Sequence, residues 1–168
     1  ERRQAIHVLR DLCCDAIMIY PRLLSVEEID GIMDAHSEPI MVRNRRLRKN
    51  SSHSVWCEHK QTSFDAVAEL ITAGHQEIAF LTGSMDSPTS IERLAGYKDA
   101  LAQHGIAFNE KLIANGKWTP ASGAEGVETL LERGAKFSAL VASNDDMAIG
   151  AIKALHERGE EVPEQVSV

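Results

Sequence analysis

The sequence predicts an α/β fold built on parallel sheets, and two observations support this prediction. Short, continuously apolar runs alternate along the chain with segments of helical periodicity. A strand that is apolar at every position is typical of a parallel sheet covered on both faces. In addition, four predicted helices stop at glycines that lie 31, 29 and 25 residues apart, about the length of a strand–helix–strand unit. These stop glycines are Gly74, Gly105, Gly134 and Gly159.

Each element is justified by its own local pattern. The apolar runs predict four strands: Ala16–Tyr20, Ile40–Val42, Ile78–Leu81 and Ala139–Ala142. Helical spacing predicts five helices: Val26–Ala35, Gln61–Ala73, Ser90–Gln103, Ser122–Arg133 and Asp145–Glu157. Ser25 with Glu28, and Ser122 with Glu125, have the spacing of a capping box, which satisfies free amides at a helix start. Glycine ends such helices because it takes the left-handed conformation without steric cost.

The stretch from Arg43 to Ser54 breaks this alternation. Four arginines and Lys49 crowd together there before a polar Asn-Ser-Ser. The change in composition indicates a long surface loop or a boundary between two lobes. Charge runs are usually solvated, so we expect a solvated loop, with a phosphate contact as the alternative.

Length and charge limit the class of protein. The chain has 168 residues and a net charge of -7, which disfavours a free-standing nucleic-acid binder. Its size fits one domain or two small lobes, and no apolar stretch approaches the roughly 18 residues that span a bilayer. With no signal peptide and only three cysteines, we expect a soluble cytoplasmic protein. The first residues look like a helix in progress and Val166–Val168 like a strand cut short, so we expect part of a longer chain.

The enzyme and metal motifs are weak. The chain has no phosphate-binding glycine loop, and Ser84 follows a strand without the second glycine of a nucleophile elbow. The remaining reactive groups have ordinary explanations. We expect Asp145 and Asp146 to be acids at a helix start, and Cys13 and Cys14 to be small buried thiols. His53 and His59 lie near Cys57, but at a spacing that fits no zinc site. We therefore expect no catalytic residue, no metal and no cofactor.

Polar and aromatic side chains remain on the loops that follow the strands, where α/β proteins bind ligands. They are Asn44, Ser87, Thr89, Arg93, Trp118 and Asn144. Amides and guanidinium groups bind pairs of sugar hydroxyls, and an indole stacks on sugar C–H groups. Two alternatives stay open, since Trp118 could be a partly exposed core residue and Arg93 could form a surface salt bridge. The residues themselves thus indicate a ligand-binding α/β protein.

Four motifs indicate the class of protein more specifically than the single residues do. In chain order they are AGHQEIAFLTG (73–83), SIERLAGYKDALAQHGI (90–106), NGKWTPASGAEGVETLLERG (115–134) and ALVASNDDMAIGAIKALHERGEEVPEQVSV (139–168). Together they closely resemble the effector-binding core of the LacI/GalR family of bacterial transcription repressors. The N-terminal segments ERRQAIHVLRDLCCDAIMIYP and EPIMVRNRR extend the resemblance over the whole chain. Within the family the chain is most similar to the repressor of a β-glucoside (arbutin, salicin, cellobiose) utilisation operon.

The resemblance implies a periplasmic-binding-protein-like fold of two parallel-sheet subdomains, residues 1–57 and 58–168, both partial, with the effector in a cleft between them. It implies effector contacts from Arg93, Trp118 and Asn144, from Asn44 in the other subdomain and, with weaker alignment, from Ser87 and Thr89. It also implies a homodimer or tetramer with Ile149 at the dimer interface, no membrane, and operator DNA bound by a helix-turn-helix upstream of Glu1. A sugar that favours one orientation of the lobes would then change operator affinity.

The chain also departs from the family pattern. Many members have Asp-Asn and a glycine pair where this chain has Cys57-Glu58-His59-Lys60-Gln61-Thr62-Ser63, so the crossover between the subdomains differs. Asn44 replaces an acid, which gives one donor and one acceptor group and prevents copying the effector from a relative. Two rival functions remain: a periplasmic-type sugar-binding transport protein, and an α/β enzyme acting on a sugar.

Overall fold

The computed structural model of the protein describes residues 8–9, 12, 14–21 and 24–168. The chain divides into two compact units, Glu1–Cys57 and Glu58–Val168, each with its own parallel sheet. Most of the helix expected at the start of the chain, and Cys13, lie outside the described residues. The α/β fold with two parallel sheets is confirmed, and each unit is described by itself below.

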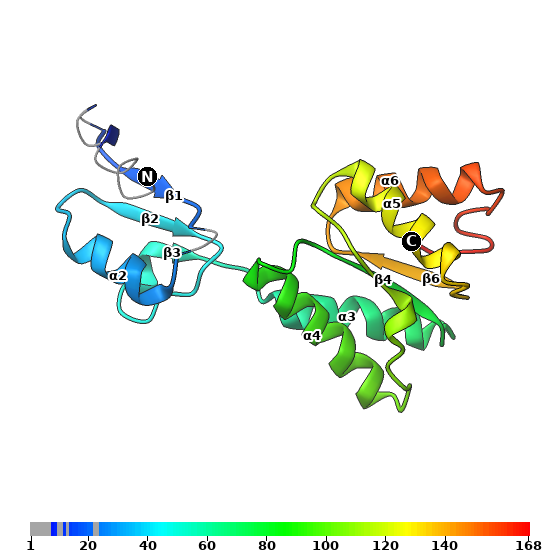
Figure 1. The fold of residues 1–168 in the computed structure, drawn as a ribbon. Helices are drawn as coiled ribbons and strands as arrows, with labels where there is room; N and C mark the ends of the chain where they lie inside the picture. Colours follow the sequence, from blue (N-terminus) through cyan, green and yellow to red (C-terminus); the bar gives the residue numbers. More distant parts are fainter. Residues whose placement is uncertain (1–7, 10–11, 13, 22–23) are drawn as a thin grey trace. The chain divides into compact units, whose positions relative to one another are not determined.

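Unit 1 (Glu1–Cys57) is a three-stranded sheet in the order β1-β2-β3 (Figure 1). The strands β1 (Ile17–Ile19), β2 (Ile40–Arg43) and β3 (Ser54–Val55) are parallel, and the helix α2 (Val26–Asp34) connects the first two. One face of the sheet packs against α2 to form a small apolar core. Its buried residues are Ile17, Ile29, Ile32, Ile40, Val42 and Leu47.

The start of α2 and the basic stretch after β2 are two parts of unit 1 with a local sequence prediction. The predicted capping box at α2 is confirmed, since the Ser25 hydroxyl accepts from the Glu28 amide and the Glu28 carboxylate accepts from the Ser25 amide. The basic stretch after β2 is a loop with a short 3-10 turn, Ser51–His53. It is more than a solvated loop, because Leu47 is buried in the core of the unit. Two of its cations, Arg48 and Lys49, pair with the α2 carboxylates at positions 27 and 34.

Unit 2 (Glu58–Val168) is a three-layer α/β/α structure (Figure 1). Its central strand is β4 (Ile78–Thr82), flanked by β5 (Ile113–Asn115) and β6 (Ala139–Ala142), and all pairings are parallel. One layer is formed by α3 (His59–Thr72) and α4 (Pro88–Gln103), the other by α5 (Pro120–Glu132) and α6 (Asp145–Glu157).

The sequence of β4 explains why this sheet is covered on both faces. Ile78 and Phe80 pack against α3 and α4, whereas Ala79 and Leu81 pack against α5 and α6. Successive side chains of a strand point to opposite faces, so an uninterrupted apolar run fills two cores at once. All five β4 residues are buried, as the sequence pattern predicts.

The predicted helix ends are largely confirmed. The four stop glycines all have positive φ, between 66° and 102°, which is the left-handed conformation expected after a helix C-terminus. Three predicted starts are wrong, since α3, α4 and α5 each begin two residues before the predicted Gln61, Ser90 and Ser122. Pro120 lies in the first turn of α5. The N-cap is Thr119, whose hydroxyl accepts from the Ser122 amide, so Ser122 and not Glu125 completes the capping box.

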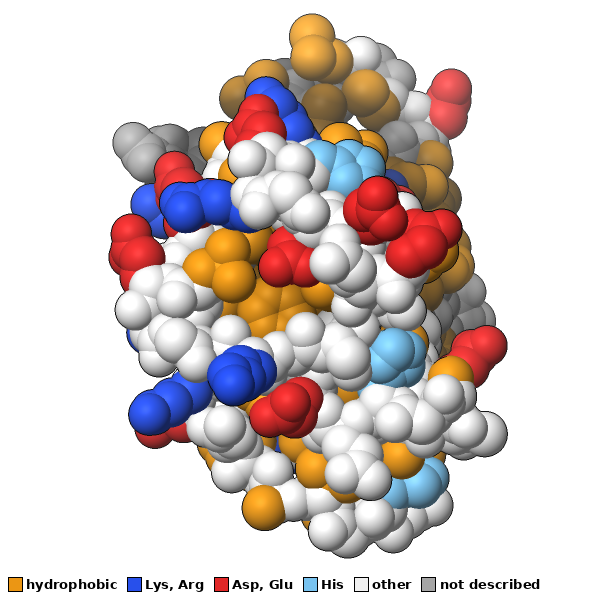
Figure 2. All heavy atoms as spheres, turned by 90° about the vertical axis from the view of Figure 1, so that its right-hand side faces the viewer, with side chains coloured by type: hydrophobic (Ala, Val, Ile, Leu, Met, Phe, Trp, Pro, Cys, Tyr) orange, Lys and Arg blue, Asp and Glu red, His pale blue; other side chains and the backbone are white. Residues whose placement is uncertain are grey.

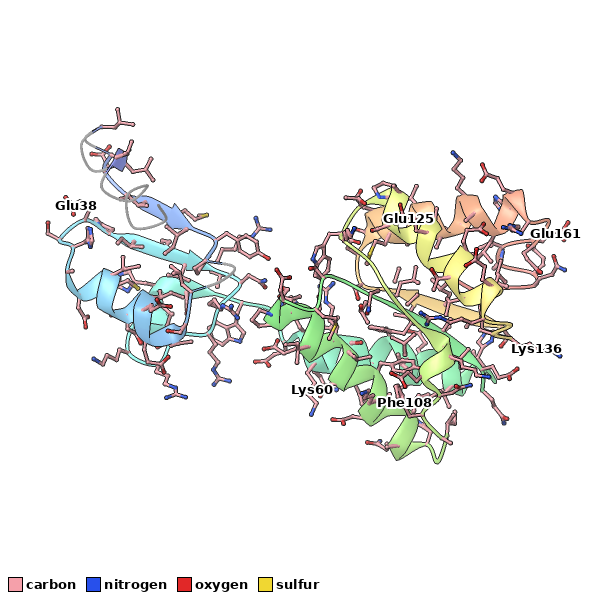
Figure 3. All side chains as sticks on the ribbon, viewed as in Figure 1. Glu38, Lys60, Phe108, Glu125, Lys136 and Glu161 are labelled. Atoms are coloured by element: carbon pink, nitrogen blue, oxygen red, sulfur yellow. The ribbon has the colours of Figure 1, made fainter. Side chains whose placement is uncertain are left out.

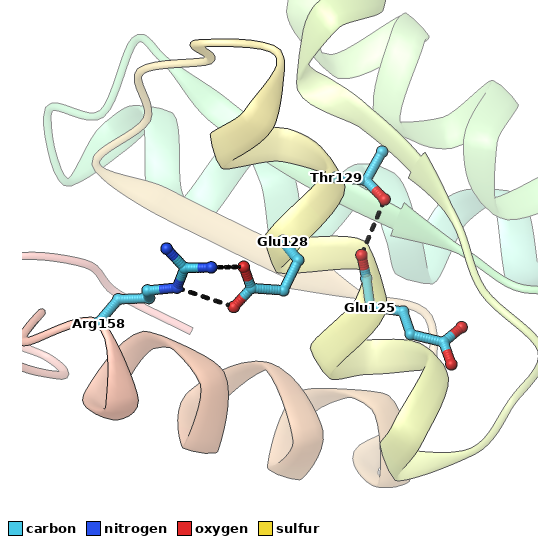
Figure 4. Close-up of polar contacts among 4 residues, drawn as sticks. All are labelled: Glu125, Glu128, Thr129 and Arg158. Atoms are coloured by element: carbon cyan, nitrogen blue, oxygen red, sulfur yellow. Dashed lines mark hydrogen bonds and ion pairs between the residues drawn. The ribbon is translucent and has the colours of Figure 1, made fainter.

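Glycines let α5 and α6 approach closely. A Cβ on Gly123 would stand 2.1 Å from the Met147 carbonyl oxygen, and one on Gly150 would stand 1.8 Å from that of Pro120. At the other end of the pair, Arg158 Nε donates to Glu128 Oε1 at 3.1 Å, and a second contact joins Arg158 Nη2 to Glu128 Oε2 (Figure 4). Within α5 the Thr129 hydroxyl donates to the backbone carbonyl of Glu125, as Figure 4 also shows. The glycine approaches and the Arg158–Glu128 pair fix how the two helices pack against each other.

The last described residues make a single parallel bridge to β6. Ser167 pairs there with Ala139, and no strand is assigned to Val166–Val168. Within the described part of the chain, no helix is long and apolar enough to cross a bilayer. On the face shown in Figure 2, acidic and basic side chains are interspersed around exposed apolar groups, in keeping with the mixed charge of the sequence.

Candidate functional site

The carboxyl ends of the three strands of unit 2 form one edge, and hydrogen bonds tie the loops there together. The Thr82 hydroxyl, at the end of β4, donates to Asn115 Oδ1 at the end of β5 over 2.9 Å. The Gly116 amide donates to the Thr82 carbonyl, and Ser143 after β6 donates its amide and hydroxyl to the Leu81 carbonyl. The loops after these strands are therefore held by the sheet.

Trp118 lies at the centre of this edge. It follows β5 and precedes the α5 N-cap, and its backbone has φ 66°, a left-handed conformation that costs a non-glycine residue roughly 1–2 kcal/mol. Its indole packs directly against the backbone of Gly83, where a Cβ would stand 2.1 Å from Trp118 Cζ2. The half-buried ring is thus placed by a strained backbone and by a glycine in the loop after β4.

Arg93 reaches the same ring from α4. Its Cζ atom is 5.9 Å from the Trp118 ring centroid, within the range of a cation–π contact. Its Nη2 is 3.3 Å from Nδ1 of His59, the first residue of α3. These two contacts of Arg93 are to an aromatic ring and to an imidazole.

Asn144 completes the group from the side of β6. It is the N-cap of α6, with Oδ1 accepting from the Met147 amide at 3.2 Å. Its Nδ2 donates to the Trp118 carbonyl at 3.3 Å. Arg93, Trp118 and Asn144 therefore form one continuous chain of contacts. The cap engages one lone pair of Oδ1 and the bond to Trp118 engages one N–H, so the amide keeps one donor and one lone pair for a ligand.

The two hydroxyl residues of the predicted set lie at the start of α4. Thr89 is half-buried in the first turn, four residues before Arg93, so the two share a helix face. Ser87 is the N-cap residue and is only 4 % exposed, with no side-chain cap bond. Thr89 is therefore better placed than Ser87 to reach a ligand beside Arg93.

Asn44 belongs to unit 1 and lies at the carboxyl end of β2. Its φ is 62°, and its Nδ2 donates to the hydroxyl of Tyr20, which follows β1, over 3.2 Å. Trp56 follows β3 at the same edge and lies 5.3 Å from the Arg46 guanidinium. Sequence reasoning missed Tyr20 and Trp56 as candidates. The signal was an aromatic side chain directly after a strand, but the two residues of β3 gave no strand pattern.

The sequence suggested for His59 only a metal ligand or an ordinary histidine, yet the residue lies beside Arg93. It is 8 % exposed, and its pKa is lowered by burial first and then by the charge of Arg93, with Glu58 opposing. A neutral imidazole can accept a hydrogen bond at Nδ1, and the guanidinium can only donate. The geometry thus defines which nitrogen of His59 carries the proton.

The weaker candidates have other partners. The Ser84 hydroxyl donates to Asp86 Oδ1 at 2.7 Å, and His53 contacts its neighbour Ser52. Asp145 and Asp146 are exposed in the first turn of α6, where Asn144 and not either acid provides the cap. Among the residues that the structure describes, no three His, Cys, Asp or Glu side chains are grouped to hold a metal ion. Cys14 and Cys57 are free thiols.

Comparison with known proteins identifies relatives of this chain. The family described as "Periplasmic binding proteins and sugar binding domain of LacI family" matches residues 1–168. The HTH-type transcriptional regulator AscG of Escherichia coli K12 is 89% identical over 100% of this chain, which covers 50% of AscG. This chain therefore spans about half the length of that curated relative, and the relatives are transcriptional regulators rather than enzymes.

Solved structures agree with the fold. A sugar-binding transcriptional regulator of the LacI family from Escherichia coli, crystallised with phosphate, matches with a TM-score of 0.90 and 89% identity. The match covers 99% of this chain and 60% of that one. The transcriptional regulator CelR, solved in complex with cellobiose, matches with a TM-score of 0.81 and 26% identity over 99% of this chain and 51% of CelR.

Proposed function

The chain belongs to the family of periplasmic binding proteins and LacI-type sugar-binding domains, and we propose that it is the effector-binding part of a bacterial transcriptional repressor that senses a β-glucoside. The observation that carries the proposal is the contact chain from Arg93 through Trp118 to Asn144 at the carboxyl edge of unit 2. Arg93 comes from α4 and Asn144 from the start of α6, and both contact Trp118, the first at its ring and the second at its backbone carbonyl.

The chemistry of this group suits a sugar. An indole face covers the C–H groups of a pyranose ring, while a guanidinium presents paired N–H donors to adjacent hydroxyls. Asn144 adds a donor and an acceptor beside the ring, and Thr89 adds a hydroxyl. The group offers no paired nucleophile and base, so it favours binding over conversion.

A β-glucoside is the effector class that the relatives favour. The sequence resembles the repressor of a β-glucoside utilisation operon, and cellobiose, the ligand in the CelR complex, is itself a β-linked glucose disaccharide. The phosphate-containing structure does not distinguish among sugars. We therefore expect an aryl or glucosyl β-glucoside, such as salicin, arbutin or cellobiose, to bind.

Unit 1 supplies the second set of proposed contacts. Asn44 would bind an effector hydroxyl through its amide, and Trp56 at the same sheet edge would add an apolar surface. The position of Asn44 at the carboxyl end of β2 supports this role, because α/β proteins bind ligands at that edge of a parallel sheet.

The remaining parts of the proposal concern the whole protein. We expect operator DNA to be bound by a segment outside this chain, and the protein to act in the cytoplasm as a homodimer or tetramer. Ile149 is 61% exposed on α6, which suits an apolar contact with a second copy. An Ile149→Glu variant of the intact protein should lower the dimer fraction in sedimentation experiments, whereas Ile91→Glu on α4, also exposed, should leave it unchanged.

Effector binding changes DNA affinity only if the effector prefers one of two states of the protein. A 100-fold change in operator affinity corresponds to about 2.7 kcal/mol of coupling, a typical value for allosteric proteins. The test is to titrate the intact protein, bound to operator DNA, with salicin, arbutin and cellobiose and to follow DNA affinity and sugar consumption together. A shift in DNA affinity without product supports the proposal; product formation or an unchanged affinity with every sugar would contradict it.

A further inference from the structure

His59 buries its imidazole between the start of α3 and the side of α4. The ring is 8 % exposed, and Nδ1 is 3.3 Å from Nη2 of Arg93. The guanidinium remains protonated at every accessible pH and can only donate, so Nδ1 must accept and the ring proton must sit on Nε2. Only the neutral imidazole can make this contact.

Several features keep His59 neutral at pH 7. Burial lowers its pKa, and the positive charge of Arg93 lowers the pKa further, while Glu58 acts in the opposite direction. His59 is also the first residue of α3, and a cation is disfavoured at a helix N-terminus. Across the same two helices, Lys60 of α3 pairs with Asp99 of α4 at 2.6 Å.

The backbone around this contact is closely packed. A Cβ on Gly96 would stand 2.1 Å from the carbonyl oxygen of Lys60, so α4 passes directly against the start of α3 (Figure 3). Lys60 is the neighbour of His59, and Gly96 lies about one turn after Arg93. The separation between the imidazole and the guanidinium is therefore set by a fixed helix crossing.

We propose that His59 is the positioning residue of Arg93: its Nδ1 holds the guanidinium over the Trp118 ring in the orientation that binds effector hydroxyls. The inference rests on the proposed function, because it assigns Arg93 to the effector. A free arginine side chain has many rotamers, and each contact that restricts it reduces the ordering required on binding. Trp118 restricts the guanidinium on one side, and His59 restricts it from α3.

The proposal gives effector binding a specific pH dependence. Protonated His59 cannot accept at Nδ1 and repels the guanidinium, so Arg93 loses its position as pH falls through the His59 pKa. Because that pKa is lowered, affinity should be full at pH 7 and fall toward pH 5. An amide oxygen can accept the same bond without titrating, so His59→Gln should restore binding and remove the pH dependence.

The test measures Kd for salicin, arbutin and cellobiose on the intact protein between pH 5 and pH 8. For the sugar that binds, we expect His59→Leu to weaken binding at pH 7 about 3- to 10-fold and His59→Gln to stay within about 3-fold of the parent with a flat profile. His53→Gln, an exposed histidine, is the matched control and should keep the parent profile. Parent-like binding by His59→Leu, or an unchanged pH profile in His59→Gln, would overturn the proposal.

A second readout needs no sugar. The indole N–H NMR signal of Trp118 should shift with pH in the parent protein as Arg93 is released, and should not shift in His59→Gln. If no sugar binds but this difference is present, the effector assignment fails while the His59 contact stands. If a sugar binds but the indole signal responds equally in both proteins, the inference about His59 fails alone.

Discussion

The indole of Trp118 lies against the backbone of Gly83, so closely that a Cβ atom on Gly83 would stand 2.1 Å from Trp118 Cζ2. Two further ring atoms would lie within 2.4 Å of it. Only a residue without a side chain therefore permits this ring position. The loop after β4 thus shapes a site whose main aromatic group comes from the loop after β5.

Gly83→Ala should displace the Trp118 ring and weaken effector binding about 10-fold. The added methyl group must push the indole aside, at a cost in stability of about 1–3 kcal/mol. Binding is measured by calorimetric titration and stability by denaturant unfolding of the intact protein.

Gly31→Ala is the matched control for this change. Gly31 lies within α2, and an added Cβ meets no atom within 4 Å. Alanine in a helix interior is favoured over glycine, so this variant should gain about 0.5–1 kcal/mol and bind effector as the parent does. Equal binding by Gly83→Ala and Gly31→Ala would mean that the ring position does not matter for the effector.

Asn144 combines two roles that one substitution can separate. Asn144→Asp keeps an oxygen that caps α6 but replaces the donor to the Trp118 carbonyl with an acceptor. We expect stability within about 0.5 kcal/mol of the parent and a clear loss of effector affinity. Asn144→Ala should lose both the cap of α6 and the donor to the Trp118 carbonyl. The missing cap should lower stability by about 1 kcal/mol. If Asn144→Asp binds normally, the Nδ2 donor has no role in the site.

Gly150→Ala should destabilise unit 2 more than any change at the sheet edge. The new Cβ would stand 1.8 Å from the carbonyl oxygen of Pro120, and a backbone atom cannot move aside as a side chain can. We expect a loss of about 3 kcal/mol or more in chemical unfolding. Trp118 lies two residues before Pro120, so binding should fall as well. Parent-like stability would show that α5 and α6 separate easily.

Tyr97 should make the protein sensitive to alkaline pH. The side chain is fully buried and donates to the Ile78 carbonyl at 2.9 Å, and burial raises the pKa of Tyr97 to about 12. The phenol of the unfolded chain titrates near 10. The contribution of Tyr97 to the free energy of unfolding is therefore complete below pH 10 and is lost as pH rises toward 12. This loss amounts to at most about 3 kcal/mol.

Tyr97→Phe separates this effect from other alkaline titrations. The variant should be about 1 kcal/mol less stable at pH 7, because it lacks the hydrogen bond, yet lose less stability than the parent between pH 10 and pH 12. Unfolding curves at fixed pH values provide the measurement. Identical slopes for the two proteins would mean that Tyr97 ionises as easily in the folded state as in the unfolded chain.

The sequence was most informative where one local pattern determined one element. The boundaries of β6 and α6 match the prediction because an apolar run, an Asn cap and the stop at Gly159 each act locally. The strands β3 and β5 were missed, since runs of two and three residues containing Ser or Asn have no strand periodicity. The start of α5 was misplaced because Pro120 fits the first turn of a helix as well as a loop.

The site was predicted as a set of residues on the loops after the strands, without the contacts between them. Topology brings the carboxyl ends of parallel strands to one edge, so the proximity of the β4, β5 and β6 loops could be predicted. The contacts themselves depend on packing between distant segments. The approach of Gly83 to the Trp118 ring and the pairing of His59 with Arg93 have no local sequence signal, because each joins residues about 35 positions apart.

The most direct measurement is calorimetric titration of the intact protein with salicin, arbutin and cellobiose, repeated on Arg93→Ala and Trp118→Ala. Two controls match these substitutions away from the sheet edge: Arg158→Ala at the C-cap of α6, and Phe108→Ala, whose side chain is exposed at 44%. We predict that one β-glucoside binds, that both site variants lose at least about 10-fold in affinity, and that the controls stay within about 2-fold. Parent-like affinity in both site variants, or no binding by any of the three sugars, would contradict the account.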